Sequence, residues 1–231
     1  MELLSEDFDR SAEGRCLRAD RRYALGLDLG KSGDPSALTV VEEVVSTFEG
    51  RDRVSGSRLM RRELFCRHLQ RWKLGTPYYA VAEDVCTMER RAPLCSVWPV
   101  VADCTGVGRA FVEILRQRGL RAPLVEVTVH GGTAVSRSDG AVNVPKRDLV
   151  AALVVALEDG TLRIANALPE AAQLRRELVG FRQKMTGKGN DSFEAMSERV
   201  HDDLVNALAL AVWQLRPAAP CGHQGRALLS F

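Results

Sequence analysis

Residues 23–45, YALGLDLGKSGDPSALTVVEEVV, decide the fold class of this chain. The apolar run Tyr23–Leu29 predicts a buried strand, and the Gly- and Pro-bearing segment 30–35 predicts the turn that ends it. Ala37–Val45 predicts a second strand, joined to the first as a hairpin. Leu59–Leu69 alternates loosely and predicts a third antiparallel strand. We therefore expect the chain to begin with an antiparallel meander.

After this meander the sequence alternates between helical and strand patterns. Helices are predicted at 78–91, 109–118, 145–158, 169–179 and 203–215, and further strands at 97–103, 124–129 and 162–165. This order is typical of a sheet with helices on its faces. We expect an α/β fold, with a mixed sheet of antiparallel meander plus parallel strands, in one domain of residues 22–215. Residues 1–21, as a tail or lead-in helix, and residues 216–231 are expected to lie outside it.

The composition is that of a soluble globular protein: 45% of the 231 residues are hydrophobic and 27% are charged. The longest apolar run, Leu149–Leu157, has nine residues, whereas about 20 are needed to cross a bilayer. A net charge of +2 gives no strong overall attraction to nucleic acid or membranes. The six cysteines form no C-x-x-C pair, and the N-terminal residues contain no apolar secretion signal. We expect a cytoplasmic protein with reduced thiols.

Basic residues gather in the segment 51–73. They are Arg51, Arg53, Arg58, Arg61, Arg62, Arg67, Arg71 and Lys73, opposed within the segment by Asp52 and Glu63. A solvated charged face would explain this pattern, and a strip that contacts phosphate groups is the alternative. The sequence leaves both interpretations open.

Acidic residues stand within or at the ends of the most apolar segments. Asp28 lies inside the first strand, Asp103 ends a later one, and Asp202 and Asp203 begin the last helix. A carboxylate in an apolar strand is costly to bury unless it is paired, and carboxylate oxygens suit Mg²⁺ or Mn²⁺. Each residue also has a purely structural explanation, as a turn former or as a helix cap. Their coincidence favours a site for two divalent ions.

Four motifs, in this order and spacing, resemble the nuclease domain of tailed-phage terminase large subunits. They are GLDLGKSGDPSAL (26–38), VADCTGVGR (101–109), VPKRDLV (144–150) and HDDLVNALALA (201–211). The resemblance covers roughly residues 22–215 and implies a ribonuclease-H-like (integrase-like) fold. It also implies an endonuclease that cuts double-stranded DNA during packaging. By residue, it implies that Asp28 bridges two metal ions, that Asp103 is the second ligand and that the His201-Asp202-Asp203 motif supplies the third.

Adjacent helical residues point about 100° apart, so Asp202 and Asp203 cannot face one site equally. The last motif also resembles the last helix of Holliday-junction resolvases, which favours Asp203 acting with Asn206 on the same helix face. Asp202 is then a cap or a further ligand. Many members of the resembled family have Asp at the position of Asn206, so a fourth charged ligand is absent here. His201 is a candidate for contact near the scissile phosphate, or a neighbour of the helix cap.

Lys146 and Arg147 are candidates for phosphate contacts. They open the helix 145–158, where cations are disfavoured, and solvated first-turn residues are the alternative. The Gly-rich segment Gly131–Asn143 is expected to be a loop that flexes against DNA. The resulting hypothesis is an Mg²⁺- or Mn²⁺-dependent endonuclease that hydrolyses phosphodiester bonds. One ion would activate a water molecule, and the other would neutralise the leaving 3′-oxygen.

Terminase large subunits normally carry an N-terminal ATPase domain, for which the roughly 21 residues before the first strand leave no room. The segment Gly26–Ser32 is one residue short of a P-loop. We therefore expect a free-standing nuclease module, a split-gene product or a prophage remnant. Its partners would be DNA and a separate terminase ATPase, small terminase subunit or portal.

Two alternative functions remain. The first is a non-catalytic or partner-dependent module for DNA packaging or DNA binding, with a vestigial site. The second is an ATPase of the sugar-kinase and actin-like superfamily, which GLDLGKSG (26–33) also resembles. Such proteins need two domains and many more residues.

Overall fold

The meander is present and is longer than the sequence pattern indicated. We analysed a computed structural model, which describes residues 13–30, 33–106, 108–138, 140–186 and 202–217. Strands β1 (Cys16–Asp28), β2 (Ala37–Arg51) and β3 (Arg58–Arg71) pair in antiparallel order. The expectation of a tail or lead-in helix is wrong for residues 16–21, which form the first half of β1. Three of these six residues are charged and all six are exposed, so they lack the apolar pattern that marks a strand.

The remaining strands complete a mixed eight-stranded sheet. Its other members are β4 (Val100–Asp103), β5 (Leu124–His130), β6 (Ser136–Ser138), β7 (Ala141–Pro145) and β8 (Leu162–Ile164). The strand order is β6-β7-β5-β4-β1-β2-β3-β8, in which β4, β5 and β7 run parallel to β1. This arrangement confirms the predicted mixed α/β sheet of antiparallel meander plus parallel strands, and its central order β3-β2-β1-β4-β5 fits the ribonuclease-H-like fold that the motifs imply. The expected loop 131–143 instead contains β6 and the start of β7.

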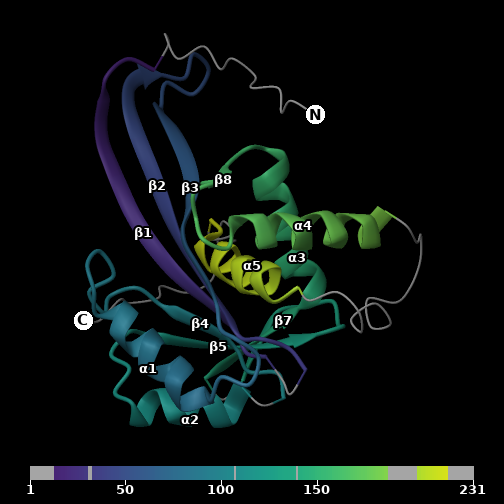
Figure 1. Cartoon of the computed structure of the whole chain (residues 1–231). Helices are drawn as coiled ribbons and strands as arrows, with labels where there is room; N and C mark the ends of the chain where they lie inside the picture. Colours follow the sequence, from purple (N-terminus) through teal and green to yellow (C-terminus); the bar gives the residue numbers. More distant parts are fainter. Residues whose placement is uncertain (1–12, 31–32, 107, 139, 187–201, 218–231) are drawn as a thin grey trace.

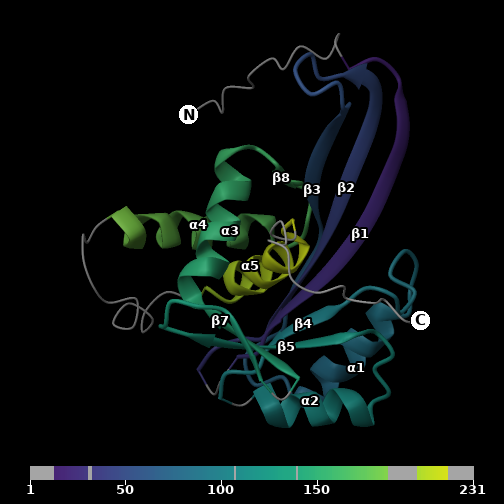
Figure 2. The same cartoon turned by 180° about the vertical axis from the view of Figure 1, so that it is seen from behind.

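Helices cover both faces of the sheet, as Figures 1 and 2 show. Helices α1 (Tyr78–Glu89) and α2 (Gly108–Gln117) lie on one face, and α3 (Lys146–Glu158), α4 (Ala171–Thr186) and α5 (Asp203–Leu215) lie on the other. A hydrophobic core lies on each face of the sheet, and alternate residues of β1 point into one or the other. Leu25 and Leu27 pack with α1 and α2, and Ala24 packs with α5. Among the described residues, no helix is long and apolar enough to cross a membrane.

Helix α5 lies directly against the backbone of β1. A Cβ atom at Gly26 would be 1.9 Å from the carbonyl oxygen of Ala207. Only a residue without a side chain permits this approach. The close contact places the N-terminus of α5, which carries the acidic motif, beside the end of β1.

A β-bulge in β3 changes which side chains face α5. Val40 pairs with His68 and Val41 pairs with Cys66, so Arg67 is an extra residue between them. A single inserted residue moves every later side chain to the opposite face. As a result Arg71, at the end of β3, lies on the same face of the sheet as α5.

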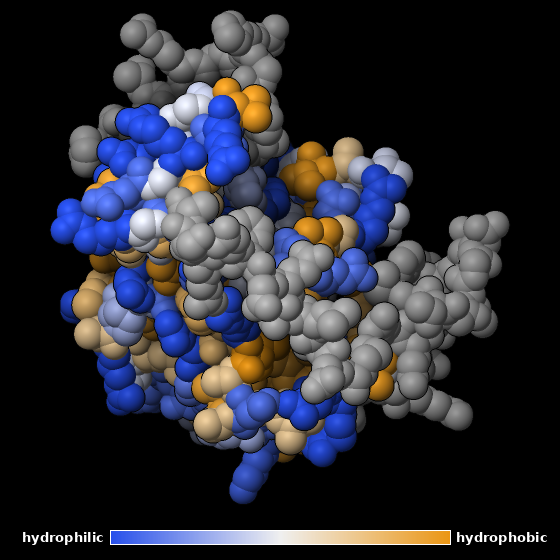
Figure 3. All heavy atoms as spheres, turned by 90° about the horizontal axis from the view of Figure 1, so that it is seen from above, coloured by the Kyte–Doolittle hydropathy of each residue, from blue (hydrophilic) through white to orange (hydrophobic). Residues whose placement is uncertain are grey.

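The far ends of β1, β2 and β3 extend beyond β4 as a long curved arm, defined here as residues 16–22, 43–51 and 58–63 (Figure 1). Seen from above, the described surface is mostly hydrophilic, and its apolar side chains form small separate groups (Figure 3). Many arginines near this arm are in ion pairs. The pairs are Arg15–Glu49, Arg21–Glu42, Arg22–Glu43, Arg61–Glu13, Arg62–Glu43 and Arg67–Glu42.

Glu43 ties this arm to the end of α5. Its side chain is 2% exposed and accepts hydrogen bonds from Arg22 Nε at 2.5 Å and Arg62 Nε at 2.7 Å. Both arginines also donate to the carbonyl oxygen of Leu215, at 3.3 and 2.9 Å. Burial alone would raise the pKa of Glu43, but the two arginines outweigh it and hold the pKa below its usual value.

Glu43→Gln should lower the free energy of unfolding by about 1–3 kcal/mol near pH 7. A carboxylate whose pKa is lowered by folding stabilises above its unfolded pKa, and this contribution is lost as pH falls through the folded value. The difference between wild type and variant should therefore shrink below about pH 4.5. Urea denaturation at several pH values measures it. The matched control is Glu113→Gln, which removes an exposed pair with Arg116 and should cost little. A difference that does not change with pH would contradict this account.

Candidate active site

Two of the predicted acidic residues meet at one edge of the sheet. Asp28 ends β1 and Asp103 ends β4, and these strands are parallel neighbours in which Leu27 pairs with Ala102. Adjacent strands lie about 4.8 Å apart, so both carboxylates leave the sheet at the same place. Both side chains are partly buried.

The N-terminus of α5 brings a third group of polar residues to this edge. Asn206 Nδ2 donates to Asp28 Oδ2 at 3.1 Å and to Asp202 Oδ1 at 3.3 Å. Asp202 is the N-cap residue of α5, but its side chain makes no capping hydrogen bond. Asn206 therefore links Asp28, at the end of β1, to Asp202, which lies one helical turn before it.

Asp28 lies in an environment that opposes its negative charge. Burial raises its pKa well above the usual value, and the charge of Asp103 raises it further. Asp203 and Asp202 act in the same direction, and the hydrogen bond from Asn206 only partly compensates. Binding of a cation between carboxylates that repel each other in this way would be favourable, because it would offset their negative charges.

Asp203 points toward a basic residue that sequence reasoning did not assign to the site. Its side chain is buried, at 7% exposure, and its Oδ2 lies 3.3 Å from Arg71 Nη2. Arg71 was visible in the sequence only as one member of the basic segment 51–73. Its place beside Asp203 depends on the bulge at Arg67, for which the sequence contains no local signal.

Glu177 of α4 is a second residue that the sequence did not reveal. It is 2% exposed, and its Oε2 accepts hydrogen bonds from the backbone N–H groups of Leu204 at 3.0 Å and Val205 at 3.3 Å. Burial raises its pKa despite these bonds. Glu177 thus caps the N-terminus of α5 from a distant segment of the chain. The Asp202 side chain is not needed as a cap, and it accepts a hydrogen bond from Asn206 instead.

Asp103 also has a structural contact. Its Oδ1 accepts a hydrogen bond from the backbone N–H of Thr105 at 2.8 Å, as the turn-forming interpretation anticipated. The hydroxyl of Thr105 in turn accepts from the N–H of Val129. The turn after β4 is therefore fixed to β5, and it holds Asp103 at the edge beside Asp28.

The predicted phosphate-contacting residues lie along the same edge. Strand β7 runs parallel to β5, so Lys146 and Arg147, which follow it, emerge on the carboxylate side of the sheet. Arg147 Nη2 donates to the carbonyl oxygen of Thr133 at 2.5 Å, and Nε lies 3.5 Å from Asp148. His201 lies outside the described residues.

The donor chemistry of this edge fits a hard divalent cation. Asp28, Asp103, Asp202 and Asp203 offer carboxylate oxygens, which are preferred ligands of Mg²⁺ and Mn²⁺. In the described part of the chain, no three His, Cys, Asp or Glu side chains are arranged as a ready metal site. The four carboxylates instead meet donors of the protein, namely Asn206, Arg71 and the Thr105 amide. Metal binding at this edge would require these side chains to change partners.

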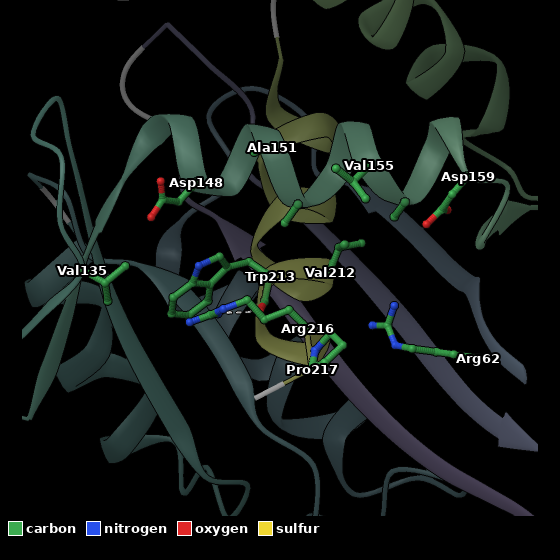
Figure 4. A pocket seen from close by; sticks show the side chains of 12 residues that line it. Arg62, Val135, Asp148, Ala151, Val155, Asp159, Val212, Trp213, Arg216 and Pro217 are labelled. Atoms are coloured by element: carbon green, nitrogen blue, oxygen red, sulfur yellow. Dashed lines mark hydrogen bonds between the residues drawn. The ribbon is translucent and has the colours of Figure 1, made fainter. Parts of the chain in front are cut away.

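A cavity of about 400 Å³ lies elsewhere, between α3 and the end of α5 (Figure 4). Ala151 and Val155 of α3 line it, together with Trp213 and Arg216. The Arg216 guanidinium lies 3.6 Å from the centre of the Trp213 ring. None of the four site carboxylates is among the lining residues, so this cavity is separate from the candidate site.

Comparisons with known proteins point to phage terminases. The chain is 27% identical over 197 residues to the terminase large subunits of Thermus phage G20c and Thermus virus P23-45. These matches cover 85% of this chain but 32% of each relative, so the chain spans about a third of their length. No family model matches. Among solved structures, T. thermophilus RuvC in complex with a Holliday junction substrate matches with 14% identity, 83% coverage of this chain, 92% coverage of that chain and a TM-score of 0.24. That TM-score is too low to add to the fold assignment.

Proposed function

We propose that this chain is a metal-dependent endonuclease module that hydrolyses phosphodiester bonds of double-stranded DNA in phage DNA packaging. The observation that carries the proposal is the meeting of Asp28, Asp103, Asp202 and Asp203 from three distant segments at one sheet edge. Burial and the charges of the neighbouring carboxylates together raise the pKa of Asp28, which supports a cation there. The similarity to terminase large subunits supports nuclease activity and the packaging role.

Asp28, Asp103 and Asp203 are the residues that would hold two Mg²⁺ or Mn²⁺ ions, with Asp202 as a fourth ligand. Bound divalent ions supply an activated water and neutralise charge on the leaving oxygen. Asn206 orients Asp28 and Asp202 through its two hydrogen bonds. Lys146 and Arg147 contact phosphate groups along the same edge and position the DNA without reading its bases.

A partner-dependent or vestigial module is the second candidate. Its support is that the site carboxylates meet protein donors, and that no ready metal group occurs in the described ranges. The similarity to terminase large subunits supports a terminase ATPase, small terminase subunit or portal as the partner. In that case DNA binding would remain without cleavage by the isolated chain.

Plasmid cleavage tests the two candidates. Purified protein should nick or linearise supercoiled DNA with Mg²⁺ or Mn²⁺ but not with EDTA. Asp103→Asn and Asp203→Asn should each lower the rate by more than about 100-fold, because even residues behind metal ligands cost about 10–100-fold. Asp159→Asn makes the same chemical change at the C-cap of α3, outside the site, and should retain activity. Metal-independent cleavage, or full activity in both site variants, would contradict the proposal.

A further inference from the structure

Arg71 is held differently from Arg62 and Arg67, two arginines of the same strand that also meet buried carboxylates. Arg62 and Arg67 use Nε to contact Glu43 and Glu42 at 2.7 and 2.6 Å. Arg71 reaches Asp203 through Nη2 alone, at 3.3 Å. Charge-assisted hydrogen bonds are normally about 2.7–2.9 Å long, so the Arg71 contact is loose.

A second nitrogen of the Arg71 guanidinium has no hydrogen-bond partner among the described residues. This atom, Nε, is buried. Leaving such a donor without a partner is unfavourable, and a geometry that costs free energy is retained mainly where it serves a function. The Arg71 side chain keeps 21% of its surface exposed, so it is accessible to a ligand from solvent.

The position of Arg71 places this guanidinium at the proposed catalytic edge. Strand β3 is antiparallel to β2 and so runs in the same direction as β1, and Ala37 pairs with both Asp28 and Arg71. Asp28 and Arg71 are therefore two strands apart, about 10 Å, at the same end of the sheet. Lys146 and Arg147 stand at this end on the other side of Asp103. Basic groups thus flank the carboxylates on both sides.

We propose that Arg71 exchanges partners during the reaction. It pairs with Asp203 while the carboxylates lack a divalent ion, and it contacts a DNA phosphate once Asp203 binds the ion. This inference rests on the proposed function and adds a positioning and DNA-binding residue to it. The exchange requires a loose contact that can be given up, and the 3.3 Å contact of Arg71 is longer than those of Arg62 and Arg67.

The exchange predicts that Arg71→Gln changes the affinities for Mn²⁺ and for DNA in opposite directions. Arg71→Gln removes a competitor for Asp203 and a nearby positive charge, so the Kd for Mn²⁺ alone should fall about fivefold. The same variant loses a phosphate contact, so binding to a 20-base-pair duplex in Ca²⁺ should weaken about five- to tenfold. The slope of log affinity against log salt should decrease by about one. Arg71→Lys keeps the charge and should stay within about twofold of wild type in both assays.

Calorimetry with Mn²⁺ and fluorescence anisotropy with the duplex measure these values. Arg67→Gln is the control, since Arg67 is on the same strand but pairs with Glu42, and it should leave both affinities unchanged. An Arg71→Gln variant that binds Mn²⁺ equally or more weakly would overturn the exchange, and so would unchanged duplex binding. If wild type binds Mn²⁺ and cleaves DNA, the proposed function stands whatever this variant does. If wild type binds no Mn²⁺, both inferences fail.

Discussion

Asp28→Asn should abolish metal-dependent cleavage and at the same time stabilise the metal-free protein. The carboxylate of Asp28 is opposed by burial and by the charges of Asp103, Asp203 and Asp202. Asparagine removes that repulsion and can still accept the hydrogen bond from Asn206. Relaxing a strained functional site typically gains about 0.5–2 kcal/mol, and each kcal/mol raises Tm by roughly 2–4 °C at this chain length.

The pH dependence gives this prediction a second readout. An acid whose pKa is raised by folding costs stability as pH rises above its unfolded pKa, because ionisation is then harder in the folded state. The gain from Asp28→Asn should therefore be small near about pH 4 and larger near pH 7. Thermal melts in EDTA across this range measure it.

Addition of Mn²⁺ should reverse the order of stability. Wild type should gain stability by binding the ion in the folded state only, whereas the variant lacks one of the proposed ligands and should gain little. Asp159→Asn serves as the control and should respond to Mn²⁺ as wild type does. A variant that melts earlier than wild type in EDTA would instead indicate that Asp28 is a structural turn residue.

The sequence predicted well those strands whose apolar pattern results directly from burial in the core. Tyr23–Leu29 and Ala37–Val45 are apolar because both lie in the middle of the sheet, covered by helices on its two faces. The beginning of β1 was missed because its residues 16–22 are exposed on both faces and are ordered by pairing with β2. Pairing between distant segments leaves no periodic signal in the strand itself.

The sequence likewise predicted only part of the candidate site. Asp28, Asp103 and the Asp202-Asp203 pair stood out because each is a carboxylate next to a turn or at a helix start, and the motifs resemble one family. Arg71 did not stand out, because a single extra residue four positions earlier decides which face it occupies. Glu177 was equally hidden, since it caps a helix 27 residues away in sequence. Register and long-range capping are properties of the folded chain.

Gly26→Ala should be among the most destabilising single substitutions in the chain. The new Cβ would lie 1.9 Å from the carbonyl oxygen of Ala207 and 2.9 Å from the backbone nitrogen of Ala211. Both atoms belong to the backbone of α5, so no flexible side chain can move aside. Overpacking of a core costs about 1–3 kcal/mol, and a contact between two backbones belongs at the upper end of this range. Gly33→Ala is the control, because its Cβ would meet nothing within 4 Å.

The same substitution should reduce cleavage by more than its effect on folding explains. The only way to relieve the contact is to move α5 away from β1, and α5 carries Asp202, Asp203 and Asn206. A shift of about 1 Å in catalytic groups can lower a rate about 100-fold. We therefore expect Gly26→Ala protein, assayed at a temperature where circular dichroism shows it folded, to lose most of its activity and the Mn²⁺-induced rise in Tm. A variant that loses less than about 1 kcal/mol and cleaves normally would mean that α5 can leave the sheet without disturbing the site. The acidic edge would then be held by the Glu177 cap and not by the contact with Gly26.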